Sequence, residues 1–146
     1  MPYQLEIPKT LIDEQLLDVE TARTALGCGR STVYRTIEAG TLTSERIGGG
    51  RFMRWADICG YAARTGAVLQ TGPQLSVVVL EFGALTVGGL ADELLVSASI
   101  IERAVNDGHL VSCSNRRYDP RFNREGITAW FDHLRAAEQI ETEVAR

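Results

Sequence analysis

No stretch of the 146-residue chain approaches the ~20 consecutive apolar residues that a membrane-spanning helix needs. The N-terminal sequence, MPYQLEIPKTLIDEQ, lacks the basic start and the apolar core of a secretory signal peptide. These two absences predict a cytoplasmic protein that has no membrane partner.

Cysteine is scarce and widely spaced. The chain has three cysteines, Cys28, Cys59 and Cys113, and an odd number at such spacing argues against a disulfide framework. The sequence also has no CxxC pair and no pair of histidines at the spacing of metal ligands. We therefore expect reduced thiols, no metal site and no cofactor.

Patterns typical of catalysis are missing as well. The adjacent carboxylates at 13–14 and 92–93 have no partner histidine and no metal-ligand spacing. The glycines at 48–50 are not followed by the Gly-Lys-Ser/Thr sequence of a phosphate-binding loop. We therefore predict that the protein is not an enzyme.

Lysine is almost absent, since fourteen of the fifteen basic residues are arginine. The net charge of −4 is unfavourable for a nucleic-acid-binding protein, but the charge is unevenly distributed. Residues 15–66 carry seven arginines against five acidic residues, whereas residues 85–146 carry seven against ten. Arginine suits bidentate contacts with phosphate and guanine, so the first of these segments is the better candidate for nucleic-acid binding.

The most informative pattern that is present is an internal repeat. Residues 17–42 align without a gap onto residues 85–110. The identical pairs are Leu17/Leu85, Val19/Val87, Leu26/Leu94, Ser31/Ser99, Arg35/Arg103, Gly40/Gly108 and Leu42/Leu110. Two copies are too few for a solenoid and predict two small, similar domains in tandem.

Each copy begins with the pattern of a helix-turn-helix. In the first copy, Val19, Ala22 and Leu26 recur at helical spacing, Asp18 is a suitable N-cap, and the glycines at 27–29 predict the turn.

The rest of the first copy completes a winged helix-turn-helix. It predicts a second helix over 31–39 that ends at Gly40, an extended stretch over 41–47, a return strand over 51–54 and a closing helix over 55–66.

The second copy repeats this order. It predicts helices over 87–94 and 99–107, a wing over 111–122 and a last helix from 124 to about 141.

The segment between the copies, 67–84, is too apolar for a flexible linker. Its valine-rich run is typical of a strand, whereas the spacing of apolar residues after Pro73 fits a helix, and the helix is narrowly favoured. Two roles remain open for it: packing the two copies together, or forming a homodimer interface through residues 75–82. The C-terminal helix is the other candidate for a homodimer interface.

The predicted fold class is mainly α with small β wings, arranged as a tandem winged helix-turn-helix. The predicted boundaries are an N-terminal arm (1–15), a first winged helix-turn-helix (16–66), an apolar connector (67–84), and a second winged helix-turn-helix with a long C-terminal helix (85–146).

In such a unit the second helix presents its N-terminal end to base edges in the major groove. In the first copy, the residues opposite the apolar face of that helix are Arg30, Ser31, Thr32, Tyr34 and Arg35. Arginine binds guanine or phosphate, and the short hydroxyl side chains suit backbone oxygens. Arg46, Arg51 and Arg54 flank the glycine-rich wing, which predicts contacts with the minor groove or with phosphates.

The first copy resembles the excisionase family, which is related to the MerR-type winged helix. The residues that carry the resemblance are LLDVETARTALGCGRSTVYRTIEAGTL, a hairpin and RFMRWADI, within roughly residues 16–65. The resemblance implies sequence-specific binding of double-stranded DNA, with cooperative binding to closely spaced sites and DNA bending. Carried over by position, it implies base reading by residues 30–35 and wing contacts by Arg46 and Arg51.

The second copy departs from this pattern, because Ala98 and Glu102 stand where the first copy has Arg30 and Tyr34. Its remaining candidates for DNA contact are Ser99, Arg103, Arg116, Arg117 and Arg121. Two interpretations stay open: the second copy reads a different half-site, or it is a degenerate copy that packs or binds protein.

The sequence therefore predicts a DNA-binding protein of the recombination directionality or transcription regulator type. The alternative is a phage-type assembly or packaging adaptor whose second copy binds protein.

Overall fold

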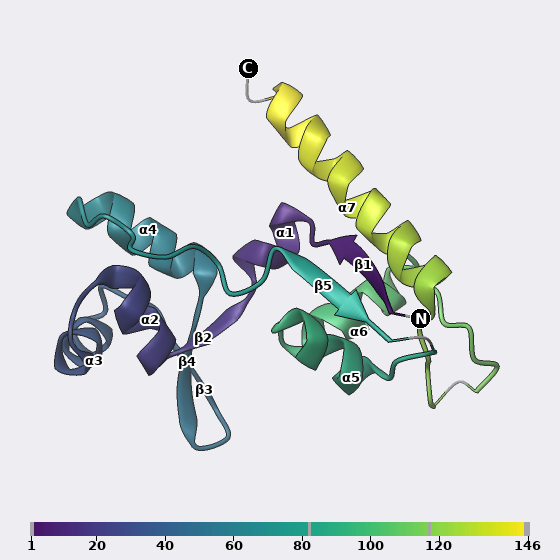
Figure 1. Cartoon of the computed structure of the whole chain (residues 1–146), viewed down its shortest axis with the longest axis horizontal. Coiled ribbons are helices and arrows are strands. Elements are labelled where there is room, and N and C mark those ends of the chain that lie inside the picture. The colour runs from purple at the N-terminus through teal and green to yellow at the C-terminus, as the bar shows by residue number, and fades with distance from the viewer. Residues whose placement is uncertain (1, 82, 117, 145–146) are drawn as a thin grey trace. The chain divides into compact units, whose positions relative to one another are not determined.

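The computed structural model describes residues 2–81, 83–116 and 118–144 of the chain. In chain order the elements are β1 (Tyr3–Glu6), α1 (Lys9–Asp13), β2 (Leu16–Asp18), α2 (Val19–Leu26), α3 (Arg30–Glu38), β3 (Glu45–Ile47), β4 (Gly50–Arg54), α4 (Trp55–Thr65), β5 (Val77–Leu80), α5 (Val87–Leu94), α6 (Ala98–Asn106) and α7 (Arg124–Val144) (Figure 1). The fold is mainly helical with two small antiparallel sheets, so the predicted class is confirmed at that level. Within the described ranges, no helix has both the length and the apolar character needed to cross a membrane.

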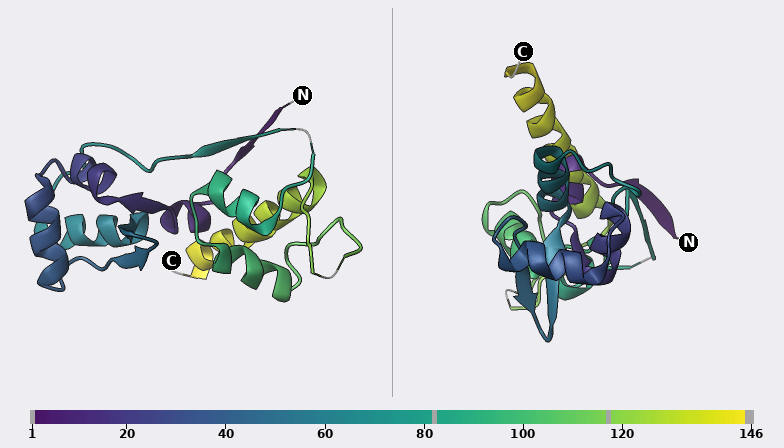
Figure 2. Two further views of the ribbon diagram at one scale, coloured as in Figure 1. Left: turned by 90° about the horizontal axis from the view of Figure 1, so that it is seen from below. Right: turned by 90° about the vertical axis from the view of Figure 1, so that its left-hand side faces the viewer.

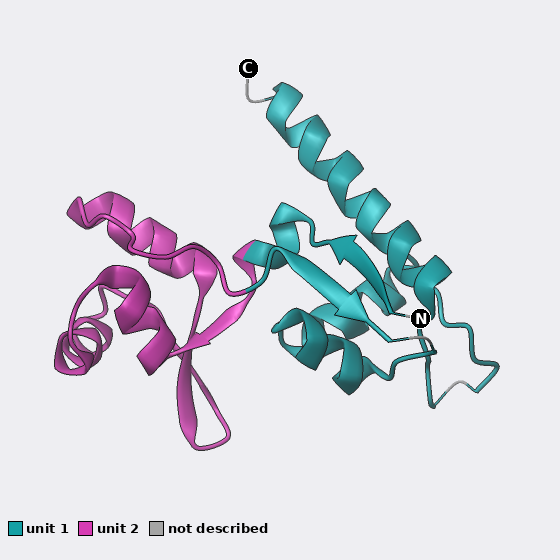
Figure 3. Ribbon diagram, in the orientation of Figure 1, with its two compact units in different colours: residues 1–12, 75–146 teal, residues 13–74 magenta. Residues whose placement is uncertain are grey.

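The chain forms two compact units (Figure 3). Unit 1 consists of residues 1–12 and 75–146, and unit 2 of residues 13–74. The predicted arm, 1–15, is divided between the units: residues 13–15 belong to unit 2, whereas β1 pairs antiparallel with β5 of unit 1 and the Ile7 N–H donates to the Ser76 carbonyl at 2.9 Å. The N-terminal segment belongs to the same unit as the second copy of the repeat.

Unit 2 contains the first copy of the repeat and its hairpin. The helices α2 and α3 pack on each other, and α4 contacts both α2 and β4. The sheet order is β2–β4–β3, and the β3–β4 hairpin projects from the helices of this unit (Figures 1 and 2). Three side chains of this unit have no exposed surface: Leu17 of β2, Val33 of α3 and Ile58 of α4. The sheet and both of these helices therefore contribute to one small core.

In unit 1, β5 corrects the narrow preference for a helix in the connector. Val78 and Leu80 are buried while Val77 and Val79 are exposed, which is the alternation of a strand with one covered face. Pairing with β1 satisfies the backbone of this short apolar run. Phe82, the last residue of the candidate homodimer interface at 75–82, lies outside the described residues.

The core of unit 1 lies between this strand pair and the helices α5, α6 and α7. Its largest fully buried side chains are Leu11, Leu80, Leu90, Leu94, Ile101, Leu110, Phe122 and Phe131.

The repeat in the sequence is also a repeat in structure. The helices α5 and α6 have the same lengths as α2 and α3 and begin and end at the aligned positions. The end of each second helix is closed in the same way, because Leu42 N–H donates to Thr36 O and Leu110 N–H donates to Ala104 O. The two copies therefore have the same pair of helices, with the same bounds and the same hydrogen bond after the second helix.

The predicted wing at 111–122 is wrong as far as the structure describes this segment. The segment forms a loop in which Ser112 Oγ accepts hydrogen bonds from the N–H groups of Ser114 and Arg121, at 3.1 and 3.0 Å. Pro120 has no N–H group and so could not complete the ladder of a return strand. Among the described residues, an isolated bridge between Leu85 and Phe122 takes the place of the β2–β4 pairing of unit 2.

Helix α7 holds the N-terminal segment in place. The Glu138 carboxylate accepts hydrogen bonds from the N–H and the hydroxyl of Thr10, both at 2.7 Å, and Arg135 donates to the Glu6 carbonyl. The C-terminal part of α7 extends beyond the other elements of unit 1 (Figures 1 and 2). There, the side chains of Ile140 and Val144 are exposed by 61% and 80%.

Candidate nucleic-acid interface

Asp18 caps the start of α2 in unit 2. Its Oδ1 atom accepts a hydrogen bond from the Thr21 N–H at 2.8 Å. This hydrogen bond holds the pKa of the Asp18 carboxyl below its ordinary value, and the positive charge of Arg30 acts in the same direction. The start of α2 therefore carries a negative charge at neutral pH.

The turn between α2 and α3 depends on Gly27. Its φ of 67° lies in the left-handed region, which glycine adopts without strain. A Cβ atom at this position would lie 2.8 Å from Cγ of Gln70, whose N–H donates to the Ala25 carbonyl at 2.7 Å. The glycine thus permits both the turn and the close approach of the segment that follows α4.

Helix α3 buries one side and exposes the other. Val33 is fully buried, and Thr32 is only half-exposed. The exposed members of the set predicted from the sequence are Arg30, Ser31, Tyr34 and Arg35. The N-cap residue, Gly29, has no side chain to accept from the first amide groups of α3. The start of α3 therefore presents backbone donors and polar side chains together.

Two arginines lie opposite each other on the β3–β4 hairpin. Arg46 on β3 is paired directly with Arg51 on β4, and like charges at opposed positions destabilise an antiparallel pair. Arg51 Nη1 donates to Ser44 Oγ at 3.3 Å, but neither arginine forms an ion pair with any residue that the structure describes. An anion bound beside the hairpin would offset this repulsion.

The third predicted wing residue, Arg54, is already paired. Its Nε lies 3.1 Å from Glu14 Oε2 and its Nη2 lies 2.5 Å from Glu45 Oε1. These contacts connect β4 to β3 and to the residues before β2. Arg54 therefore positions the hairpin, and its charge is largely compensated.

Glu20 lies next to the candidate interface, and it was not among the site residues predicted from the sequence. Its Oε1 accepts hydrogen bonds from Arg23 at 2.9 Å (Nε) and 2.5 Å (Nη2), and its Oε2 lies 3.8 Å from Arg30 Nε. The contact between Glu20 and Arg23 could be predicted from the sequence, because residues three apart on a helix are neighbours. The contact with Arg30 could not, because it exists only once the turn brings the start of α3 beside α2.

In the second copy, α6 exposes Ala98, Ser99, Glu102 and Arg103. The Ser99 hydroxyl lies 2.8 Å from that of Ser97, so one of its hydrogen-bonding positions is occupied. Compared with α3, this surface has one arginine instead of two and adds a carboxylate. It is therefore a weaker candidate for contact with phosphate.

The loop at 111–122 contains the other candidates of the second copy. Arg121 donates from Nε and Nη2 to the two carboxylate oxygens of Asp119, at 3.2 and 3.1 Å. Arg116 is exposed, and the neighbouring Tyr118 is 95% exposed. Arg117 lies outside the described residues. Arg116 is therefore the available cation of this loop within the described part of the chain.

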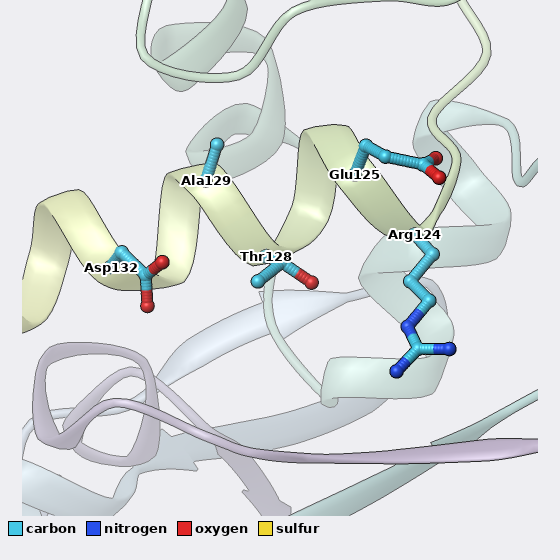
Figure 4. Close-up of a pocket in the computed structure, with 5 residues that line it drawn as sticks. All are labelled: Arg124, Glu125, Thr128, Ala129 and Asp132. Carbon is cyan, nitrogen blue, oxygen red and sulfur yellow. The ribbon is translucent and has the colours of Figure 1, made fainter.

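Unit 1 also has a shallow hollow along the first half of α7 (Figure 4). It is lined by Arg124, Glu125, Thr128, Ala129 and Asp132. The guanidinium of Arg124 lies 4.9 Å from the ring centroid of Tyr3, which gives this arginine a structural contact. Among the residues that the structure describes, no group of three or more His, Cys, Asp or Glu side chains could hold a metal ion.

The candidate interface of unit 2 thus consists of arginine, serine and tyrosine side chains on α3 and on the β3–β4 hairpin. All of these side chains can donate hydrogen bonds and the arginines also carry positive charge, which suits phosphates and the acceptors of base edges. Compared with protein-family models, with curated proteins and with solved structures, the chain matches none of them.

Proposed function

We propose that the chain binds double-stranded DNA sequence-specifically through unit 2, in an architectural or regulatory role. In this proposal α3 enters the major groove, and the β3–β4 hairpin contacts the phosphate backbone or the minor groove, as in a winged helix-turn-helix. Unit 1 supplies the second helix-turn-helix of the tandem, with a loop in place of the wing.

The observation that carries the proposal is the pair of opposed arginines on the hairpin. Arg46 and Arg51 repel each other, and no described carboxylate neutralises them. Arg35 is a further exposed cation without an ion pair among the described residues, and it lies on the helix that would read the bases. A polyanionic ligand would account for the unpaired positive charge at all three positions, because each arginine would displace a counterion from a phosphate or bind a guanine.

The repeat offers a matched pair of variants, since Arg35 and Arg103 occupy the same position of the two copies. A binding site would first be selected from a randomised duplex library. Fluorescence anisotropy would then give the Kd of each variant at several salt concentrations. We expect Arg35→Ala to weaken binding by about 1–3 kcal/mol, or roughly 5- to 150-fold, and Arg103→Ala to have a smaller effect.

The hairpin variants test the phosphate contacts. Arg46→Ala and Arg51→Ala should weaken binding to selected and unrelated duplexes alike, and each should reduce the salt slope by about one. If Arg35→Ala, Arg46→Ala and Arg51→Ala all bind as the wild type does, unit 2 does not bind DNA in this way. If Arg103→Ala costs as much as Arg35→Ala, both copies read DNA.

A second candidate function is assembly with protein through unit 1. Its support is the exposed apolar end of α7, at Ile140 and Val144, together with the exposed Val77 and Val79 on β5. A homodimer would use one of these two surfaces. If the arginine variants do not alter DNA binding, this candidate replaces the first. Light scattering of Ile140→Arg and Val77→Arg would then identify the surface by a loss of oligomer mass.

A further inference from the structure

Arg30 differs from the other exposed arginines of the candidate interface, because two carboxylates at the start of α2, Glu20 and the N-cap residue Asp18, interact with its charge. Glu20 Oε2 lies 3.8 Å from its Nε, and the charge of Arg30 contributes to the lowered pKa of the Asp18 carboxyl. Arg35 and Arg46 have no such neighbour among the described residues. Arg30 is therefore partly neutralised before any ligand binds.

Glu20 is charged and held in place. The hydrogen bonds from Arg23 keep the pKa of the Glu20 carboxyl below its ordinary value. The same hydrogen bonds direct the second carboxylate oxygen toward Arg30. The arrangement is exposed to solvent, with the side chains of Arg30 and Glu20 accessible by 63% and 54%, so the contact with Arg30 is weak and can open.

This carboxylate affects phosphate and base acceptors differently. A phosphate that approached Arg30 would also approach Glu20 and Asp18, whose negative charges repel it, and the positive charge of Arg23 would offset only part of this repulsion. The O6 and N7 atoms of guanine carry no net charge, so Arg30 can donate to them while it stays close to Glu20. The cluster therefore lowers the affinity of Arg30 for backbone more than its affinity for a base edge.

We propose that Glu20 is a specificity-determining residue that acts through Arg30: it keeps this arginine from serving as a non-specific phosphate ligand and reserves it for a neutral base acceptor. The inference rests on the proposed DNA-binding function of unit 2. It identifies guanine as the kind of base that faces the start of α3.

The test is a double-mutant cycle of Glu20→Gln and Arg30→Ala, measured on the selected site and on an unrelated duplex of equal length. In the wild-type background, Glu20→Gln should raise the affinity for unrelated duplex by roughly three- to tenfold and steepen the salt slope by up to about one. The affinity for the selected site should rise less, so the ratio of the two affinities falls. In the Arg30→Ala background, Glu20→Gln should have little effect on either duplex.

Glu38→Gln is the matched control, because it removes one exposed carboxylate from α3 that has no ion pair among the described residues. The proposal is overturned if Glu20→Gln raises the affinity equally with and without Arg30, or no more than Glu38→Gln does. Both variants keep the Asp18 cap, and circular dichroism would confirm that α2 is intact. Unchanged binding of Arg35→Ala, Arg46→Ala and Arg51→Ala would instead remove the proposed function itself, which separates the two failures.

Discussion

At the scale of single residues, the two copies place different residues in the same left-handed backbone conformation. Gly27 and Leu95 occupy the same position of the repeat, and both are left-handed, with φ of 67° and 60°. Glycine adopts this conformation freely, whereas a side chain at Cβ raises the energy by about 1–2 kcal/mol. The second copy therefore contains a strained residue that the first copy avoids.

This difference predicts opposite effects of two substitutions. Leu95→Gly should leave the free energy of unfolding of unit 1 unchanged or raise it by up to about 1 kcal/mol, because relief of strain offsets the loss of a half-buried side chain. Gly27→Ala should lower that of unit 2 by about 1–2 kcal/mol or more, because the new Cβ also meets Gln70. Urea unfolding followed by tryptophan fluorescence measures both. A clear loss of stability in Leu95→Gly would show that leucine packing outweighs the strain.

At the scale of elements, local patterns predicted the helices well. Helix α5 has the predicted bounds, α2 has the predicted Asp18 cap, and α7 begins at the predicted residue. These features depend on neighbours within one or two turns of the chain, so the sequence contains them directly.

Elements that depend on distant partners were missed or mispredicted. Strand β5 exists because β1, more than sixty residues earlier, pairs with it, and its apolar spacing also fits a helix. The pairing of Arg54 with two carboxylates and the approach of Glu20 to Arg30 likewise arise from the folded arrangement of separate segments. The sequence indicated which residue types form the candidate interface, and the structure was needed to distinguish paired from unpaired arginines.

The contact between α7 and the loop at 111–122 gives a prediction at this scale. A Cβ atom on Gly126 would lie 2.8 Å from the Val111 carbonyl oxygen, whereas one on Gly88 in α5 would meet nothing within 4 Å. Gly126→Ala should therefore lower the free energy of unfolding of unit 1 by about 1–3 kcal/mol, in spite of the better helix propensity of alanine.

Gly88→Ala is the control, and it should raise stability by about 0.4–1 kcal/mol because it only reduces the freedom of the unfolded chain. Thermal unfolding followed by circular dichroism compares the two variants. Equal stabilisation by both would mean that the loop moves aside without cost.

At the scale of the whole molecule, unit 2 is inserted between two segments of unit 1. Each unit has its own core and contains one of the two tryptophans, Trp55 in unit 2 and Trp130 in unit 1, both buried. The two units are therefore expected to unfold as separate cooperative transitions.

The tryptophans make this expectation measurable. In Trp130→Phe the remaining tryptophan fluorescence follows the unfolding of unit 2, and in Trp55→Phe it follows the unfolding of unit 1. Addition of Gly126→Ala should shift the urea midpoint seen by Trp130 and leave the midpoint seen by Trp55 in place. A common shift of both midpoints would show that the chain unfolds as one cooperative unit.

The insertion of unit 2 also sets an order of events during synthesis on the ribosome. Strand β1 is made before unit 2, whereas its partner β5 and the core residues Ile127 and Phe131 follow only after the whole of unit 2. A strand whose partner has not yet been made has unpaired backbone groups, and it can pair with another nascent chain. Glu6 within this strand and Pro8 just after it are residues that discourage such pairing, so β1 is protected against it until β5 has been made.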